Sequence, residues 1–166
     1  IALTALERLI EVRISNRNAL WSLKQGGIEI GRGHYPFMVV LHSAFLLGCV
    51  LEVQWLQPSF SPSMGYSMLL IAVLSQGLRW WSITTLGQQW NTRVILIPGF
   101  KRVQKGPYRF FSHPNYLAVI IEGFAIPLIH SAYYTAAIFT VLNAVLLWFR
   151  ISCEEKGLQE ILDCQK

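Results

Sequence analysis

The sequence is poor in charge and cysteine and lacks a glycine-rich nucleotide fingerprint. Only 14% of its 166 residues are charged and 53% are hydrophobic, against about 25% charged and 45–50% apolar in an average soluble domain. The three cysteines, Cys49, Cys153 and Cys164, form no CxxC pair and have no metal-ligand spacing. The lack of a GxGxxG motif argues against a Rossmann-type nucleotide-binding domain. Together these absences favour a lipid-embedded protein over a soluble one.

The hydrophobic residues are gathered in long runs. Residues 1–10 have the composition of the end of an apolar helix, which we expect to begin before Ile1. Four further runs follow, at residues 36–53, 65–81, 116–129 and 132–149. Crossing a bilayer takes about 20 helical residues, so the first, second and last of these runs are predicted spans. The run 116–129 is shorter and contains Glu122 and Pro127, which predicts a tilted or broken helix.

Basic residues alternate between the connections. The segments 54–64 and 130–133 contain no Lys or Arg. The other connections contain Arg13, Arg17, Lys24 and Arg32, then Arg79, Arg93, Lys101, Arg102, Lys105 and Arg109, and finally Arg150, Lys156 and Lys166. Because short cytoplasmic loops are enriched in Lys and Arg, this pattern predicts about five crossings with the N-terminus outside and the C-terminus in the cytoplasm. We therefore predict an all-α, polytopic membrane helix bundle. The net charge of +5 follows from these loops and does not indicate a nucleic-acid partner.

The polar segment 87–116 is the best candidate for a site on the cytoplasmic side. Ser112 followed by Pro114 predicts a helix start, which places His113 in the first turn. Free backbone N–H groups there favour a carboxylate or another anion. A lone histidine at this place is more often bonded to a loop carbonyl. Several polar and aromatic neighbours favour a binding site instead, namely Tyr108, Arg109, Asn115 and Tyr116.

Two further charged groups have open interpretations. Glu122 lies well inside an apolar run, where a carboxylate must be paired, protonated or beside a wet cavity, so a structural hydrogen bond and a cofactor contact are equally plausible. If the last helix continues past residue 149, Arg150 and Glu154 are four residues apart and share a face. By spacing alone, an ordinary salt bridge at a helix end explains this pair.

Taken together, these residues resemble a known family. The string Gly106-Pro107-Tyr108-Arg109-x-x-x-His113-Pro114-x-Tyr116, followed by Glu122, Pro127 and Arg150-x-x-x-Glu154-Glu155, is similar to the C-terminal core of the isoprenylcysteine carboxyl methyltransferases. The resemblance covers about residues 87–160. It implies an S-adenosylmethionine-dependent O-methyltransferase in one membrane domain, residues 1–166, with spanning helices in 1–86 and a cofactor-binding and catalytic core in 87–166.

The resemblance also implies roles for individual residues. It assigns Arg150 and Glu154 to catalysis beside the transferring methyl group. It assigns the cofactor pocket to Gly106, Pro107, Tyr108, His113, Pro114, Tyr116, Glu122 and Glu155. Ser112 departs from the family, because many members have Arg immediately before His-Pro. A carboxylate acceptor would need orientation and partial desolvation, which Arg150 could provide, whereas a hydroxyl acceptor would also need a base, for which Glu154 is the nearest candidate.

The N-terminal half resembles a particular branch of the family. Residues 7–18, Gly26-Gly27-Ile28-Glu29 and Gly33-His34-Tyr35-Pro36 are similar to bacterial members that accompany type III polyketide synthases and methylate alkylpyrones or alkylresorcinols. The resemblance implies a lipid-like or prenylated acceptor, contact with membrane lipids, and a bacterial inner membrane with the site facing the cytoplasm.

Two other classes remain open on sequence alone. A membrane reductase of the sterol-reductase type would use NADPH and has a similar His-Pro-Asn-Tyr segment, but it resembles the chain less at Arg150-x-x-x-Glu154-Glu155. A non-catalytic membrane subunit would bind neither ligand. We predict no metal, because His34, His42, His113 and His130 are scattered along the chain.

Overall fold

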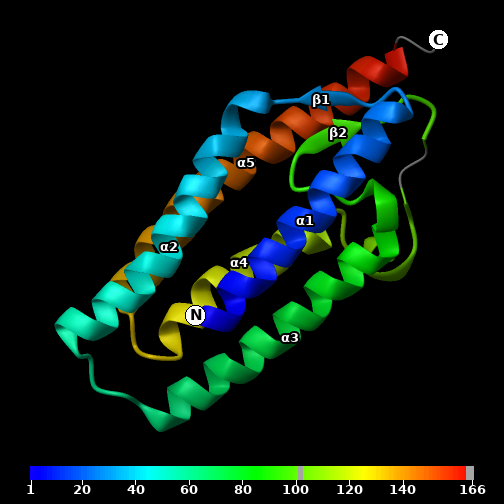
Figure 1. Cartoon of the computed structure of the whole chain (residues 1–166). Helices are drawn as coiled ribbons and strands as arrows, with labels where there is room; N and C mark the ends of the chain where they lie inside the picture. Colours follow the sequence, from blue (N-terminus) through cyan, green and yellow to red (C-terminus); the bar gives the residue numbers. More distant parts are fainter. Residues whose placement is uncertain (101–102, 164–166) are drawn as a thin grey trace.

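Helices make up most of the fold (Figure 1). The computed structural model describes residues 1–100 and 103–163, so Lys101, Arg102, Cys164 and Lys166 lie outside the described part. The α-helices are α1 (Ala2–Lys24), α2 (Tyr35–Leu56), α3 (Pro62–Leu86), α4 (Pro114–Leu128) and α5 (Tyr133–Asp163). Three 3-10 turns, η1 (Arg32–His34), η2 (Gly87–Gln89) and η3 (Gly106–Arg109), lie between them. The predicted helical class is therefore confirmed.

A small sheet was not predicted. Strands β1 (Ile28–Ile30) and β2 (Val94–Leu96) pair antiparallel, with Ile28 opposite Leu96 and Ile30 opposite Val94. Strands of three residues are too short to show an alternating pattern in the sequence. The C-terminal part of α5 packs on this sheet at Gly157, where an added Cβ would lie 2.1 Å from Ile30 Cδ1. The sheet thus joins the segment after α1 to the segment after α3, beneath α5.

Two helical stretches among the described residues are long and apolar enough to cross a bilayer, Arg32–Leu56 and Tyr133–Gln159. They correspond to two of the five predicted crossings. Helix α4 has 15 residues, or about 22 Å at the usual helical rise, against a hydrocarbon core of about 30 Å. It is continuous rather than broken, because Pro127 lies in its last turn and displaces few hydrogen bonds.

The expected end of the first helix is wrong. Residues 13–24 were assigned to a cytoplasmic connection, but α1 continues to Lys24. Ser15, Asn18 and Ser22 are buried against the segment after α3, whereas Arg13, Asn16, Arg17 and Lys24 are exposed. Asn18 Nδ2 donates to the carbonyls of Gly87 (3.0 Å) and Trp90 (2.8 Å), and the Ser15 hydroxyl accepts from the Thr92 backbone N–H (2.9 Å). These tertiary contacts keep a polar stretch helical.

The hydrophobic core lies where α2, α3, α4 and α5 meet. Its buried members include Phe45, Cys49, Ala125 and Phe139. Gly123 allows a close approach there, because an added Cβ would lie 2.2 Å from Phe139 Cε1. Cys49 is 3% exposed and serves there as a small hydrophobic residue.

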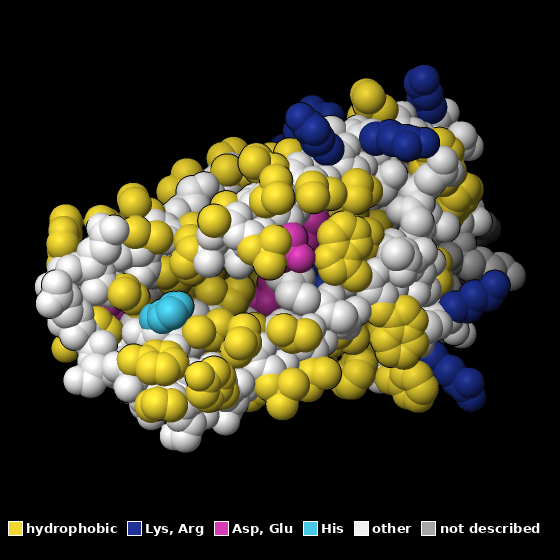
Figure 2. All heavy atoms as spheres, turned by 60° about the horizontal axis from the view of Figure 1, so that its bottom comes forward, with side chains coloured by type: hydrophobic (Ala, Val, Ile, Leu, Met, Phe, Trp, Pro, Cys, Tyr) yellow, Lys and Arg dark blue, Asp and Glu magenta, His cyan; other side chains and the backbone are white. Residues whose placement is uncertain are grey.

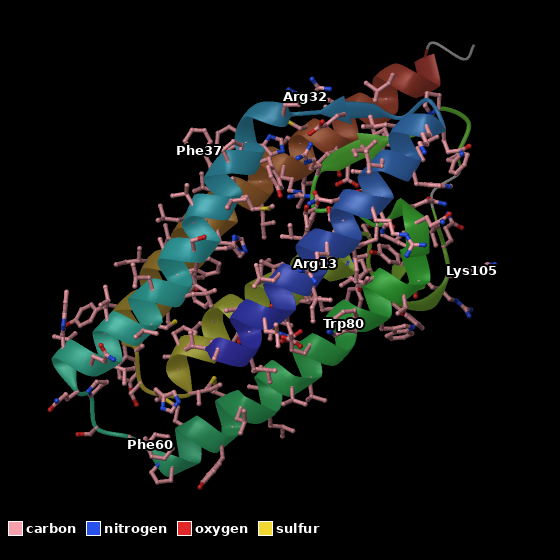
Figure 3. All side chains as sticks on the ribbon, in the orientation of Figure 1. Arg13, Arg32, Phe37, Phe60, Trp80 and Lys105 are labelled. Atoms are coloured by element: carbon pink, nitrogen blue, oxygen red, sulfur yellow. The ribbon has the colours of Figure 1, made fainter. Side chains whose placement is uncertain are left out.

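Charge is unevenly distributed along the molecule. Figure 2 shows the Lys and Arg side chains gathered toward one end, while hydrophobic side chains cover most of the visible face. Figure 3 places Arg32 and Lys105 in the half that carries the sheet and Phe60 at the opposite end. The connections that contain Lys and Arg therefore lie toward one end of the structure, and the connection 54–64, which contains none, lies at the other end.

The start of α5 depends on a side chain from α2. Glu52 accepts hydrogen bonds from the backbone N–H groups of Tyr134 (3.0 Å) and Thr135 (2.7 Å) and from the Thr135 hydroxyl (2.6 Å). These N–H groups have no partner within their own helix. We expect Glu52→Ala to lower the free energy of unfolding in detergent by about 1–2 kcal/mol, in the range of other helix-capping losses. Gln54→Ala, at an exposed position of the same helix, is the control, and equal losses in both variants would contradict the capping role.

Candidate active site

Arg150 lies at the centre of a polar network near the cytoplasmic end predicted from the charges. Its side chain is on α5 and is 5% exposed. Nε donates to the Tyr116 hydroxyl at 2.9 Å, and another guanidinium nitrogen bonds the Thr92 carbonyl. Nη1 contacts Met38 Sδ at 2.8 Å, and the guanidinium also lies over the Tyr116 ring. The network thereby joins α5 to α4, to α2 and to the segment after α3.

Glu154 extends this network by one helical turn. The Tyr116 hydroxyl donates to Glu154 Oε2 at 2.9 Å. His113 Nδ1 lies 4.0 Å from the same oxygen, and the His113 ring stacks on Tyr116 with a centroid distance of 5.2 Å. His113 is the residue immediately before α4, and its carbonyl accepts from the backbone N–H groups of Tyr116 and Leu117. The His-Pro segment and the Arg-Glu pair therefore meet at one place.

The turn η3 brings Tyr108 to the same place. Burial, and next the Glu154 carboxylate, raise the pKa of Tyr108 above its ordinary value, so the phenol stays protonated at neutral pH. Gly106 has a φ of +54°, and an added Cβ would lie 2.6 Å from Thr85 Oγ1 on α3. Pro107 and Pro114 are fully buried. These three residues therefore hold η3 and the start of α4 in place.

A cavity of about 360 Å³ lies beside the network. Tyr116 and Arg150 form part of its wall. Most of the remaining wall is apolar and comes from α1, α2, α4 and α5, with Leu9, Val12, Val39, Leu46, Val119, Leu146 and Leu147 among the lining residues. The lining also includes Trp90, Asn115 and Asn143, each of which has a buried polar atom without a partner in the described part of the chain. The cavity thus has a long apolar wall and a few unused hydrogen-bonding groups.

Glu122 lies in a different cluster. Its Oε2 accepts from Arg8 Nη2 (2.9 Å) and Arg79 Nη1 (3.1 Å), and the two arginines also bind both oxygens of Glu11. Arg8, Glu11 and Arg79 line the same cavity as Arg150. The four charges balance, which permits their burial among apolar helices. The structure shows the hydrogen bonds to neighbouring helices that one interpretation of Glu122 expects, and a cofactor contact of Glu122 stays a prediction.

The predicted site residues thus fall into four groups. Tyr108, His113, Tyr116, Arg150 and Glu154 come together. Gly106, Pro107 and Pro114 support them through backbone packing. Glu122 lies in the ionic cluster, about two turns along α4 from Tyr116 at helical spacing. Glu155 is exposed, unlike its neighbour Glu154.

Sequence reasoning missed several residues of the site. Arg8 and Glu11 belong to the N-terminal segment of family resemblance, and Arg79 belongs to a predicted basic connection. Charged residues within helices of low overall charge nevertheless indicate ion pairing. Met38 and Thr92 carry no sequence signal, since one contacts Arg150 through sulfur and the other through its carbonyl. Asn143 could have been found from the sequence, because it is an amide inside an apolar run and lies seven residues before Arg150.

Comparison with known proteins agrees with this geometry. Residues 68–160 match the isoprenylcysteine carboxyl methyltransferase (ICMT) family. That range contains η3, α4 and the site-bearing part of α5, and the chain belongs to this family of membrane-associated methyltransferases. It is also 41% identical over 162 residues to the uncharacterized protein YpbQ of Bacillus subtilis (strain 168), an alignment that covers 96% of this chain and 95% of that protein. No solved structure matches significantly.

The cluster of Arg8, Glu11, Arg79 and Glu122 makes a prediction about stability. Glu122→Gln leaves two buried arginines with one carboxylate, and we expect the free energy of unfolding to fall by about 3 kcal/mol or more. Glu29→Gln is the matched control, because Glu29 pairs with Arg32 and Arg93, whose side chains are 76% and 38% exposed. The Glu29 side chain is itself only 9% exposed, but solvent reaches both of its partners, so we expect a smaller loss than for the buried cluster. Chemical unfolding in detergent measures both variants, and similar losses would show that the buried cluster is not a main support of the helices.

Proposed function

We propose that this protein transfers a methyl group from S-adenosylmethionine to a carboxyl or hydroxyl oxygen of a lipid-like acceptor dissolved in the membrane. The observation that carries the proposal is the position of Arg150. One side of this residue contacts Tyr116 and, through it, Glu154, and the residue also lines an apolar cavity of about 360 Å³. A polar co-substrate and an apolar acceptor can meet at such a place.

The residues on the Glu154 side fit S-adenosylmethionine. This molecule supplies a methyl group on positively charged sulfur and also carries an amine and a carboxylate. The Glu154 carboxylate complements positive charge, and its side chain is 25% exposed, so a ligand can reach it. Asn115, in the first turn of α4, has a buried Oδ1 without a partner in the described residues. Tyr108, His113 and Tyr116 would enclose the same molecule with aromatic surface.

The cavity fits the acceptor. Its apolar lining suits a long hydrocarbon chain, because removing such a chain from water is favourable and a preformed pocket needs little rearrangement. The lining comes from α1 on one side and α2 on the other, with Leu9 and Val39 as examples. We propose that the acceptor reaches the site from the bilayer between these two helices.

Arg150 would orient the acceptor oxygen. Its Nη1 contacts a thioether sulfur, which is a weak hydrogen-bond acceptor. A carboxylate, carbonyl or phenol oxygen would be a better partner and could displace Met38 at this N–H. Positioning of this kind is a large part of catalysis in displacement reactions. If the acceptor is a hydroxyl, the proton lost as the new O–CH₃ bond forms would pass to the Glu154 carboxylate.

The proposal includes a placement in the membrane. The end that carries the sheet and the basic side chains would face the cytoplasm of a bacterial cell, and α1, α3 and α4 would complete a five-helix membrane bundle with α2 and α5. The gathering of Lys and Arg at one end supports this orientation (Figure 2). The N-terminal resemblance to the branch that accompanies polyketide synthases favours alkylpyrones or alkylresorcinols as acceptors.

Ligand binding distinguishes the proposal from the alternative reductase. We expect purified full-length protein in detergent to bind radiolabelled S-adenosylmethionine and to retain it in the presence of excess NADPH. Lipid extracts incubated with the protein and S-adenosylmethionine should gain about 14 mass units per acceptor, the mass of one CH₂. Binding of NADPH without S-adenosylmethionine would favour the reductase, and binding of neither would favour a non-catalytic subunit.

Substitutions test the assignment of Glu154 and His113. We expect Glu154→Gln or His113→Ala to lower the rate of methyl transfer by about 100-fold or more, in the range of lost acid–base or positioning groups. Lys156→Gln is the control, because Lys156 is exposed on the same helix. Unfolding temperatures close to wild type would show that the variants are folded. Full activity in both site variants would remove these residues from the reaction.

A further inference from the structure

The buried face of α5 contains one polar residue between its two ends. The buried residues of this helix and of the residue before it follow helical spacing, at Ala132, Ala136, Phe139, Asn143, Leu147 and Arg150. Steps of three and four residues place all of them on one stripe. The buried residues between Ala132 and Arg150 are apolar except Asn143, so at this position a neutral amide replaces the expected core side chain.

The Asn143 amide is not explained by packing. The side chain is among the largest fully buried ones, at 2% exposed, and its Oδ1 has no hydrogen-bond partner among the described residues. An unpaired buried amide is unfavourable compared with an apolar side chain of the same size. Leucine, which has a similar shape, would serve a purely structural role better. A polar group kept at a cost to stability is expected where a ligand uses it.

Asn143 lines the cavity that Arg150 also lines. The two residues are seven positions apart, which is about two turns or 10 Å along a helix. Long helical side chains lean toward the helix N-terminus, so the Arg150 side chain extends in the direction of Asn143. An acceptor whose reacting oxygen binds Arg150 can therefore present a second group to Asn143.

We infer that Asn143 is a specificity-determining residue, whose amide hydrogen-bonds a neutral oxygen of the acceptor other than the one that receives the methyl group. This inference rests on the proposed function. An amide both donates and accepts, so it binds a hydroxyl or a carbonyl. It does not neutralise charge, so it favours a neutral group. A head group with one oxygen would leave the amide unpaired in the complex and would bind less well.

The test compares two acceptors with the same alkyl chain, an alkylbenzene with two ring hydroxyls and one with a single hydroxyl. Full-length protein in detergent is supplied with S-adenosylmethionine, and kcat/KM is measured for each acceptor. We expect wild type to prefer the dihydroxy acceptor by about 10-fold or more, as for the loss of one buried hydrogen bond. In Asn143→Leu the preference should fall to within about twofold of unity while activity on the monohydroxy acceptor remains.

Thr140→Val is the matched control. Thr140 lies on the same helix one turn before Asn143 and also has a buried hydroxyl without a partner in the described part of the chain, yet it is not part of the cavity lining. Its variant should keep the wild-type preference. The unfolding temperature of Asn143→Leu should equal or exceed that of wild type, because an unpaired polar group is removed.

The possible results distinguish a failure of the role of Asn143 from a failure of the proposed function. An unchanged preference in folded Asn143→Leu would overturn the role of Asn143, and it is the result expected if an ordered water satisfies the amide. Equal activity of wild type on the two acceptors would overturn it too, even if the variant does not fold. Methyl transfer to neither acceptor, by folded protein that binds S-adenosylmethionine, would also overturn the role of Asn143, whereas folded protein that does not bind S-adenosylmethionine would overturn the proposed function.

Discussion

Buried arginines determine how the helices of this protein are arranged. A guanidinium cannot lose its proton in a protein, so among apolar helices it must be surrounded by hydrogen-bond acceptors. Arg79 obtains them from Glu11 and Glu122, which ties α3 to α1 and α4. Arg150 obtains them from Tyr116 and the Thr92 carbonyl, which ties α5 to α4 and to the segment after α3. The packing of the helices follows from these requirements as much as from hydrophobic contact.

The two arginine centres also shape the cavity between them. Both Arg79 and Arg150 contribute to its lining, and apolar side chains of α1 and α2 form much of the remaining wall. A pocket with charged groups fixed by their partners keeps its shape without a ligand, because moving either guanidinium would break several hydrogen bonds at once. Such preorganisation is what a transfer reaction requires of its site. The Asn143 amide contrasts with these guanidinium groups, because its Oδ1 is one of several buried polar atoms without a hydrogen-bond partner among the described residues.

The sequence predicted the helices and the convergence at the site well, for identifiable reasons. Long apolar runs and alternating basic connections are strong signals, and they located α2 and the starts of α3 and α5 to within about three residues, although α3 and α5 continue 5 and 14 residues beyond the predicted runs. The His-Pro segment and the Arg-Glu pair are local motifs, and family resemblance related them to one site. The continuation of α1 to Lys24 was not predictable, because it depends on tertiary contacts such as those of Asn18 with the carbonyls of Gly87 and Trp90. The location of Glu122 depended on partners 43 and 114 residues away in the chain.

The pairing of β1 with β2 bears on how the family should be divided into parts. The family match begins at residue 68, yet β2 is completed by β1, and Gly157 of α5 rests against Ile30 of that strand. The matched region therefore depends on β1, which lies outside it, for the pairing of β2 and for the packing of Gly157. Chimeras that exchange the N-terminal halves of relatives would change the strand that pairs with β2 as well as the part of the cavity lining that comes from α1 and α2. A change in the cavity lining and a change in the support of the candidate site would therefore occur together in such chimeras.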